Sequence, residues 1–167
     1  MKLISSEQEL RDSGEKLKYI EISDVTRYGL ITSYIEEEFD ALPSRGEYQV
    51  ETGDILMAIN NSSRGTVVLV PEEFNGAICT SGFLVIKPRT EEEGHLLWYS
   101  LRSEHCRKQI YYLSQTASQP ELKTKAWKEV FKIPFPIGDA RTNAVKVSTD
   151  FQQYLRAIIH ADQFRYS

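Results

Sequence analysis

The sequence predicts an α+β fold in which a β-rich core is followed by a helical C-terminal segment. Short apolar runs separated by turn residues fill Gly53–Pro88, as expected for strands connected by hairpins. After Pro88 the apolar residues recur mostly every three to five positions, which is the spacing of a helix. With 167 residues and 41% hydrophobic composition, the chain is long enough to bury a core of its own.

The first strand is expected at Lys18–Ile22, where side chains alternate with the period of a half-buried strand. Gly29 marks a turn into residues 30–35, so this part of the chain predicts a first hairpin. Turns at 43–46 and 52–54 then lead into candidate strands at 48–50 and 55–59.

Three more strands are expected in the most β-rich part of the chain, at 66–70, 77–80 and 83–87. The polar segment 60–65 precedes the first of them. The runs Val67–Val70 and Phe83–Ile86 are continuously apolar, which predicts strands that are covered on both faces.

One helix is expected over His95–Leu113, with Glu91–Glu93 favourably placed at its positive N-terminal end. A short helix is expected at Lys123–Val130, and a short strand at 131–133 that the following prolines end. The last helix is expected at about 150–165, since Thr149 followed three residues later by Gln152 is typical of a capping box.

An apolar stripe along this last helix predicts either a contact with the core or an interface with a partner or a second copy of the chain. The stripe consists of Phe151, Tyr154, Leu155, Ile158 and Ile159.

Charge is unevenly distributed along the chain, whose net charge is −4. Residues 1–57 carry 6 basic and 13 acidic side chains, whereas residues 98–132 carry 7 basic and 3 acidic ones. The overall charge argues against nonspecific coating of DNA, because that binding depends on Lys and Arg. The basic segment predicts either a local surface for an anionic partner or a solvated helix face.

The sequence predicts no metal site, no cofactor and no catalytic centre. Cys79 and Cys106 lack the spacing of metal ligands, and no glycine-rich phosphate loop occurs. Neighbouring carboxylates in 36–38 and 91–93 point apart, and His105-Cys106 lacks a third group to orient it. No run reaches the roughly 18 apolar residues of a membrane span, and the N-terminus lacks a secretory signal, so we expect a cytoplasmic protein with no membrane contact.

Four short motifs follow one another over Tyr19–Pro136. They are Ile22-Ser23-Asp24 at a strand end, Gly53-Asp54-Ile55-Leu56 at a turn before a strand, Ser81-Gly82-Phe83 at the entry to another strand, and the closing Ile133-Pro134-Phe135-Pro136. In this order they resemble the target recognition domain of type I restriction-modification specificity subunits. The resemblance implies a recognition-domain-like core at residues 1–140, followed by a C-terminal capping or dimerisation helix at 141–167.

The resemblance also implies a sequence-specific DNA-recognition module that is not an enzyme. Specificity subunits carry two such domains, and the helix after each domain pairs with the other so that each domain reads half of a split target. Other subunits supply the chemistry. The expected partners are therefore double-stranded DNA, a DNA adenine methyltransferase subunit, and a second recognition domain or a second copy of this chain.

The chain departs from the family pattern in two ways. It holds one recognition domain, and Ile137–Arg141 stands where the family usually begins a helix containing Glu-Gln. The expected last helix would span only about 24 Å, which is short for a spacer between domains. Three interpretations remain open: a half-size subunit that dimerises, a domain of a larger protein, and a relative with a different partner. A second function also remains open, that of a non-catalytic protein-interaction or assembly module whose working surface is the acidic N-terminal third.

Reading base edges in the major groove requires paired donors and acceptors, chiefly Arg for guanine and Asn or Gln for adenine. Two polar loops offer such groups, and Lys residues beyond the second can contact phosphates. The expected DNA-binding residues are Asn60, Asn61, Ser63 and Arg64 in the first loop, and Gln115 and Gln119 in the second, 114–119, together with Lys123 and Lys125 beyond it. An ordinary hairpin turn and a polar linker are the alternatives.

Overall fold

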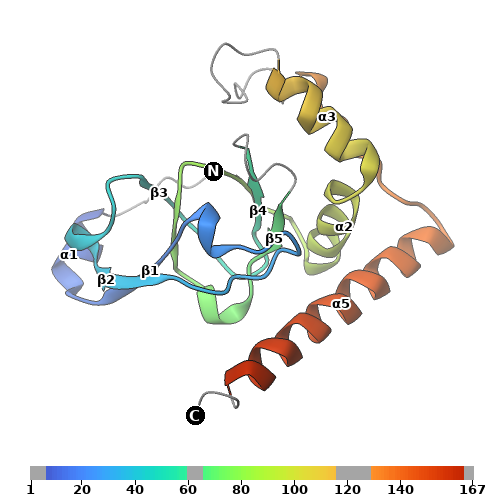
Figure 1. Ribbon diagram of the computed structural model, residues 1–167. Coiled ribbons are helices and arrows are strands. Elements are labelled where there is room, and N and C mark those ends of the chain that lie inside the picture. The colour runs from blue at the N-terminus through green and yellow to red at the C-terminus, as the bar shows by residue number, and fades with distance from the viewer. Residues whose placement is uncertain (1–6, 60–65, 116–128, 164–167) are drawn as a thin grey trace.

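The computed structural model describes residues 7–59, 66–115 and 129–163. Two small sheets form the core, and the longer helices lie on one side of them (Figure 1). This is the α+β architecture that the sequence predicts. The helices are α1 (Glu7–Ser13), α2 (Glu91–Leu101), α3 (Glu104–Gln115) and α5 (Asp139–Gln163), with 3-10 turns η1 (Ile22–Asp24), η2 (Phe39–Ala41) and η3 (Glu72–Phe74). The strands are β1 (Lys16–Ile20), β2 (Ile35–Glu38), β3 (Gly46–Gln49), β4 (Ile55–Ala58), β5 (Val67–Leu69), β6 (Ile78–Thr80) and β7 (Phe83–Ile86).

The two sheets differ in how their strands pair. The four-stranded sheet has the order β2-β1-β6-β3, in which β1 and β6 are parallel and the other neighbours are antiparallel. The three-stranded sheet has the order β5-β4-β7 and is antiparallel throughout. Each strand expected in 53–88 therefore has a counterpart in the structure.

The three-stranded sheet is covered on both faces, as its continuous apolar runs predict. On β4, Leu56 packs into one core cluster with residues of the four-stranded sheet, while Met57 packs into a second cluster with α2. On β7, Val85 joins the first cluster and Leu84 joins the second. Successive strand residues point to opposite faces, so a strand between two layers must be apolar at every position.

The predicted first hairpin is confirmed only in that β1 has an antiparallel partner, because that partner is β2, which shares only Ile35 with the expected second strand at 30–35. β1 pairs antiparallel with β2, with Lys18 opposite Glu36. β1 ends at Ile20 because the chain then turns into η1, where the Asp24 carboxylate accepts a hydrogen bond from the Glu21 amide at 2.8 Å. Residues 30–34 form no strand, and Ile31 makes an isolated bridge with Val25.

The single helix expected over His95–Leu113 is wrong, because two helices, α2 and α3, share that segment. Thr90 caps α2 by accepting from the Glu93 amide at 3.1 Å, and the acidic first turn of α2 lies where the sequence predicts it. The Ser103 hydroxyl accepts from the Cys106 amide at 3.3 Å and so begins α3.

The strand expected at 131–133 is also wrong, since these residues form no strand. The Gln109 side chain of α3 takes the place of a neighbouring strand. Its amide nitrogen donates to the Lys132 carbonyl at 2.7 Å, and its amide oxygen accepts from the Lys132 N–H at 2.9 Å. Most of the helix expected at Lys123–Val130 lies outside the described residues.

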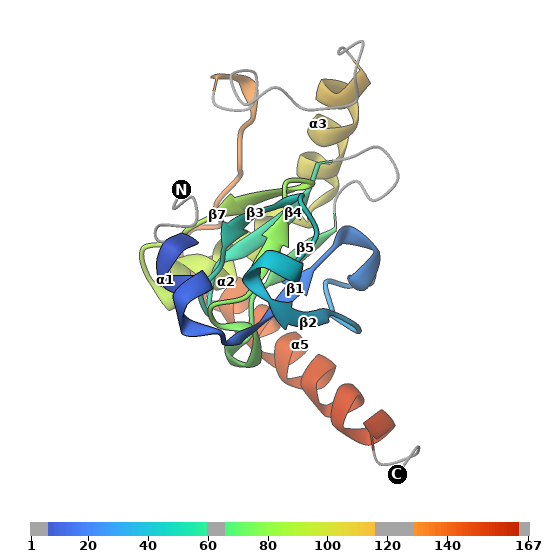
Figure 2. The same ribbon diagram turned by 90° about the vertical axis from the view of Figure 1, so that its left-hand side faces the viewer.

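The last helix begins earlier than the sequence predicts. α5 has 25 residues and starts at Asp139, so at 1.5 Å per residue it spans about 37 Å. Thr149 lies inside the helix, where its hydroxyl donates to the Val145 carbonyl at 3.0 Å instead of capping an N-terminus. Figure 2 shows the C-terminal end of α5 extending beyond the sheets. In the described part of the chain, no helix combines the length and the apolar character that crossing a membrane requires.

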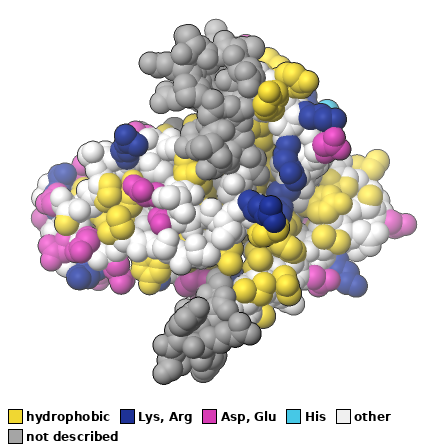
Figure 3. All heavy atoms as spheres, viewed as in Figure 1, with side chains coloured by type: hydrophobic (Ala, Val, Ile, Leu, Met, Phe, Trp, Pro, Cys, Tyr) yellow, Lys and Arg dark blue, Asp and Glu magenta, His cyan; other side chains and the backbone are white. Residues whose placement is uncertain are grey.

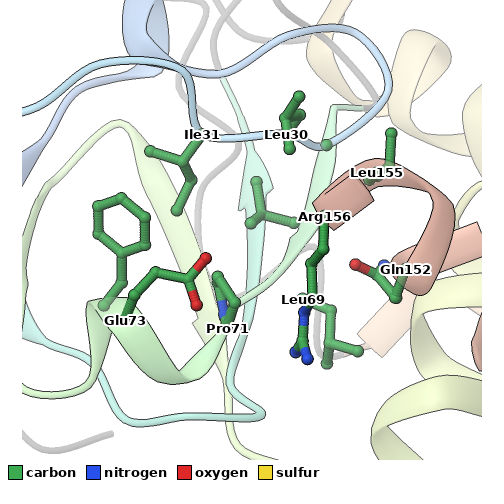
Figure 4. Close-up of a pocket in the computed structure, with 11 residues that line it drawn as sticks. Leu30, Ile31, Leu69, Pro71, Glu73, Gln152, Leu155 and Arg156 are labelled. Carbon is green, nitrogen blue, oxygen red and sulfur yellow. The ribbon is translucent and has the colours of Figure 1, made fainter. Parts of the chain in front are cut away.

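A small cavity lies where α5 crosses the segment 29–31 and η3 (Figure 4). Gln152, Leu155 and Arg156 of α5 line one side, and Pro71 and Glu73 line the other. Its volume of about 20 Å³ has room for about one water molecule. The buried Gln152 Nε2 has no hydrogen-bond partner among the described residues, so a water in this gap would satisfy a polar group.

Candidate nucleic-acid interface

Most side chains expected to contact DNA lie outside the described residues. These are Asn60, Asn61, Ser63, Arg64, Gln119, Lys123 and Lys125. Gln115 is the last residue of α3, and its side chain is also outside the described part of the structure. The role of all eight residues in DNA binding therefore stays a prediction.

The structure does describe the elements that flank both segments in the sequence, β4 and β5 around 60–65 and α3 before 116. β4 and β5 pair up to the edge of the 60–65 loop, where the Ala58 N–H donates to the Thr66 carbonyl at 3.0 Å. All four residues of β4 are buried. α3 leads into the second loop and is fixed to the core by the buried Cys106 and Ile110. Binding residues are commonly placed on loops that a rigid scaffold positions in this way.

A tight turn at Thr26–Leu30 lies against the beginning of β5. The Thr26 N–H donates to the Leu30 carbonyl at 2.8 Å, and the Leu30 N–H donates to the Thr26 hydroxyl at 3.2 Å. Gly29 has a φ of +82°, and a Cβ atom at this position would collide with the Val67 carbonyl oxygen. The turn therefore holds Arg27 and Tyr28 in a fixed place at the surface.

Arg102, which follows α2, connects this turn to the helices. Its guanidinium donates to the Tyr28 carbonyl at 2.8 Å and lies 4.4 Å from the ring centre of Trp98 and 5.4 Å from that of Phe151. Burial lowers the pKa of Arg102, and the nearby charge of Arg107 lowers it further. Arginine nevertheless stays protonated, so a positive charge is held in partly desolvated surroundings.

Arg27, Arg102 and Arg107 thus form a connected group, which we call the arginine cluster. The Arg27 guanidinium stacks 4.6 Å from the ring centre of Tyr28 and donates to its hydroxyl, and Arg107 Nε donates to the Arg102 carbonyl at 3.3 Å. Figure 3 shows a few Lys and Arg side chains beside hydrophobic ones to the right of the centre of the view, with an acidic side chain next to them. Within the described residues, no ion pair joins the cluster to a carboxylate. Other basic residues are so paired, namely Arg11, Lys87, Lys108 and Arg141.

The sequence carries only partial signals of this cluster. Arg102 follows Trp98 by four residues, so both lie on one helix face, and that spacing indicates a cation–π contact. Arg107 belongs to the basic segment 98–132. The bond from Arg102 to Tyr28, however, joins positions 74 residues apart, which local spacing does not reveal.

A separate acidic surface lies at the edge of the four-stranded sheet. Glu36, Glu37 and Glu38 are exposed on the edge strand β2. Arg11 reaches this region and pairs with Asp40 at 2.7 Å. Figure 3 shows acidic side chains gathered at the left-hand end of the view, with a few Lys and Arg side chains among them. The edge of this sheet is therefore locally acidic, although Arg11 and the neighbouring lysines of β1 partly offset its charge.

The apolar residues of α5 that were expected to form a partner interface fall into two groups, one packed against the core and one exposed. Leu155 is only 5% exposed, and Phe151 packs into the core cluster against Trp98 with the two ring centres 5.4 Å apart. Tyr154 is 61% exposed, and Ile158 is half-buried. The side chain of Ile159 lies outside the described residues. Part of the stripe is thus a core contact of this chain, while Tyr154 faces outward.

Neither thiol is suited to nucleophilic chemistry. Cys79 and Cys106 are both buried, and burial raises the pKa of Cys79 to about 12 and also raises that of Cys106. Thiols with raised pKa values stay protonated at neutral pH and are poor nucleophiles. Over the described ranges, no three His, Cys, Asp or Glu side chains gather as a metal site would require.

No protein-family model matches the sequence, and no curated protein matches it. Solved structures do match. The chain aligns over 90% of its length with the HsdS subunit from Thermoanaerobacter tengcongensis, with a TM-score of 0.68 and 23% sequence identity. It aligns equally far, with a TM-score of 0.67 and 25% identity, with a chain from work on complex assembly and conformational transition of the type I R-M system. The chain spans 40% and 41% of the lengths of these two chains.

Both structural relatives are specificity subunits of type I restriction-modification systems. The chain has the fold of their target recognition domain. The resemblance carried by the four sequence motifs is thereby confirmed at the level of the fold.

Proposed function

We propose that this chain is a non-catalytic, sequence-specific DNA-recognition module that directs a partner DNA methyltransferase to its target in the cytoplasm. The observation that supports this most strongly is the alignment of nearly the whole chain with type I specificity subunits. The basic bias of residues 98–132 supports it further, because a DNA-binding face must present a local basic surface even when the net charge is negative.

In this proposal the two sheets and α3 hold the polar segments 60–65 and 114–119, with Lys123 and Lys125, against the duplex. Amide and guanidinium groups of the loops contact base edges, and the lysines contact phosphates. Residues 1–140 form the recognition domain, and residues 141–167 form the helix that meets a partner. The partner that supplies the chemistry is a DNA adenine methyltransferase subunit.

The outward face of α5 is the surface that we assign to a second recognition domain or a second copy of the chain. Val147 and Tyr154 are exposed there, at 52% and 61%, and lie two turns apart on the same side of the helix. At about 37 Å, α5 is long enough to extend past the sheets, as Figure 2 shows. Phe151 and Leu155 do not serve this interface in our proposal, because they pack within the chain.

Salt dependence of duplex binding tests the DNA-binding part of the proposal. We expect affinity to fall steeply as salt rises, and replacement of Lys123 and Lys125 by Ala to flatten that dependence by about one unit of slope per lost phosphate contact. If the affinity for duplex DNA changes neither with salt nor on replacement of Lys123 and Lys125, the alternative of a protein-interaction module is favoured. The exposed acidic strand β2 would then be the working surface.

Copurification from the native cell tests the partner. We expect a DNA adenine methyltransferase to be recovered with the tagged chain. We also expect Tyr154→Glu to reduce recovery of a second copy or a second recognition domain without unfolding the chain. Recovery of unrelated proteins alone would contradict the assignment.

A further inference from the structure

In the arginine cluster, the charge of Arg107 lies close enough to that of Arg102 to lower its pKa. Within the described residues no ion pair joins the cluster to a carboxylate, although Glu104, which pairs with Lys108, also interacts with the charge of Arg107. Like charges held close together repel one another, and the repulsion is stronger where water is partly excluded. Arg102 is in such a place, since its guanidinium is covered by Trp98 and Phe151. An anionic group that binds at the cluster would relieve this repulsion.

The cluster is also fixed in position before any ligand arrives. Arg102 is held by the Tyr28 carbonyl and two aromatic rings, and Arg27 is held by the ring and hydroxyl of Tyr28. Groups that are already ordered lose little conformational entropy on binding. Guanidinium groups bind phosphate oxygens through paired hydrogen bonds, and the 46% exposed Tyr28 adds a hydroxyl of the kind that contacts DNA phosphates.

The place of the cluster in the fold indicates which phosphates it meets. The turn that carries Arg27 lies against Val67, one residue beyond Thr66, where the first polar loop rejoins the sheet. Arg107 lies in the first turn of α3, the helix that leads into the second polar loop. The cluster therefore lies between the elements that flank both segments expected to face DNA.

We propose that the arginine cluster binds the phosphodiester backbone of duplex DNA and sets the position of the domain on it, while the two polar loops read the bases. Arg27 and Arg107 make the phosphate contacts, with Tyr28 beside them. Arg102 is a positioning residue that fastens the Thr26–Leu30 turn to α2. This inference rests on the proposed function, and it assigns the contacts with the DNA backbone, which do not depend on base sequence, to the arginine cluster.

Two exposed arginines of the cluster and one matched control test the inference. The variants are Arg27→Ala and Arg107→Ala, and the control is Lys16→Ala, which removes one positive charge from the β1 position opposite Glu38. Binding of the full chain to two duplexes of unrelated sequence is measured by fluorescence anisotropy over a series of salt concentrations. Melting temperatures are measured in parallel to confirm that each variant folds.

We expect each cluster variant to weaken binding to both duplexes by about tenfold at low salt. Each should also lower the slope of log affinity against log salt by about 1. Arg107→Lys should keep most of the slope, since the charge remains. Lys16→Ala should leave affinity and slope close to those of the unmodified chain.

The possible results separate the inference from the function on which it rests. If the unmodified chain binds duplexes and the cluster variants behave like Lys16→Ala, the inference is overturned and the proposed function stands. If the variants weaken binding to one duplex only, the cluster reads sequence, which also overturns the inference. If the unmodified chain binds no duplex even at low salt, the proposed function fails and the inference fails with it.

Discussion

His95 Nδ1 lies 2.9 Å from Ser148 Oγ, and this contact joins the middle of α2 to α5. Ser148 is fully buried, and an exposed ion pair between Glu92 and Arg141 at 2.8 Å also joins the two helices. We call this contact between α2 and α5 the helix seam. Burial lowers the pKa of His95 below its ordinary value of 6.5. Glu91 acts in the opposite direction, whereas Arg156 lowers the pKa further. The imidazole is therefore neutral in the folded chain at neutral pH.

The helix seam should weaken in mild acid. The pKa of His95 is lower in the folded chain than in the unfolded chain, so in mild acid the unfolded chain binds more protons. Proton binding then favours the unfolded chain, and the folded chain loses stability as the pH falls through 6.5. We expect the free energy of unfolding to fall between about pH 7.5 and about pH 5.5, and His95→Gln to reduce that fall. Urea denaturation at both pH values measures it, with His105→Gln at an exposed position of α3 as the control. If His95→Gln leaves the pH dependence of stability unchanged, the conclusion that His95 is held in its neutral form is contradicted.

Substitution of two glycines with left-handed backbone distinguishes the cost of a steric collision from the cost of backbone strain. Gly29 and Gly53 have φ values of +82° and +86°, but only at Gly29 would a Cβ atom collide with another residue. We expect Gly53→Ala to cost about 1 kcal/mol of folding free energy through strain alone. Gly29→Ala should cost more than about 2 kcal/mol, since the turn must also move away from β5. Chemical denaturation measures the free energy of unfolding of both variants. Equal losses of stability would show that the Thr26–Leu30 turn does not pack tightly against β5.

A buried ion pair secures the turn before β4. Asp54 is 4% exposed, and its carboxylate accepts from Lys87 Nζ at 2.7 Å and from the Glu51 N–H at 2.8 Å. Burial alone would lower the pKa of Lys87, but the hydrogen bonds to Asp54 and Glu51 outweigh it and raise that pKa.

We expect Asp54→Ala to cost about 2–4 kcal/mol, because it leaves a partly buried ammonium and a backbone donor without this acceptor. The comparison is Glu104→Ala, which breaks an exposed pair with Lys108 and should cost less than about 1 kcal/mol. Unfolding free energies from urea titrations measure both variants. Equal costs would mean that burial of Asp54 contributes nothing.

Neighbouring positions on α5 should respond very differently to truncation. Phe151 packs against Trp98 and under Arg102, whereas Tyr154 is largely exposed. We expect Phe151→Ala to cost about 2–4 kcal/mol and to weaken duplex binding, since Arg102 loses a supporting ring. Tyr154→Ala should cost less than about 1 kcal/mol. Denaturation curves for both provide the measurement, and a larger loss for Tyr154 would contradict the orientation of α5.

Local patterns predict the sheets better than they predict the helices. The strands in 53–88 follow from continuous apolar runs between turn residues, because a strand between two layers needs an apolar residue at every position. The break between α2 and α3 lies inside an otherwise helical pattern, and its local sequence signal is the capping hydroxyl of Ser103. Thr149 and Gln152 carry a capping pattern, yet α5 continues through them because Ala144 and Ser148 are buried in the helix seam upstream. Tertiary packing here overrides a local signal.

The candidate interface was predictable only in part for the same reason. Polar composition points to 60–65 and to 114–119 with Lys123 and Lys125, and the elements that flank these segments contribute to one core cluster. The arginine cluster depends on contacts between the Thr26–Leu30 turn, α2 and α3, which are distant in sequence. Such contacts arise from the packing of the turn against β5 and leave no periodic pattern in the sequence.

Selection from a pool of randomised duplexes tests the central claim most directly. The full chain, purified from its native cell together with whatever accompanies it, is used to retain duplexes over several rounds, and the retained pool is sequenced. We predict enrichment of one defined sequence pattern that contains an adenine suitable for methylation. Retention of duplexes without any enriched pattern, or no retention at low salt, would contradict the account.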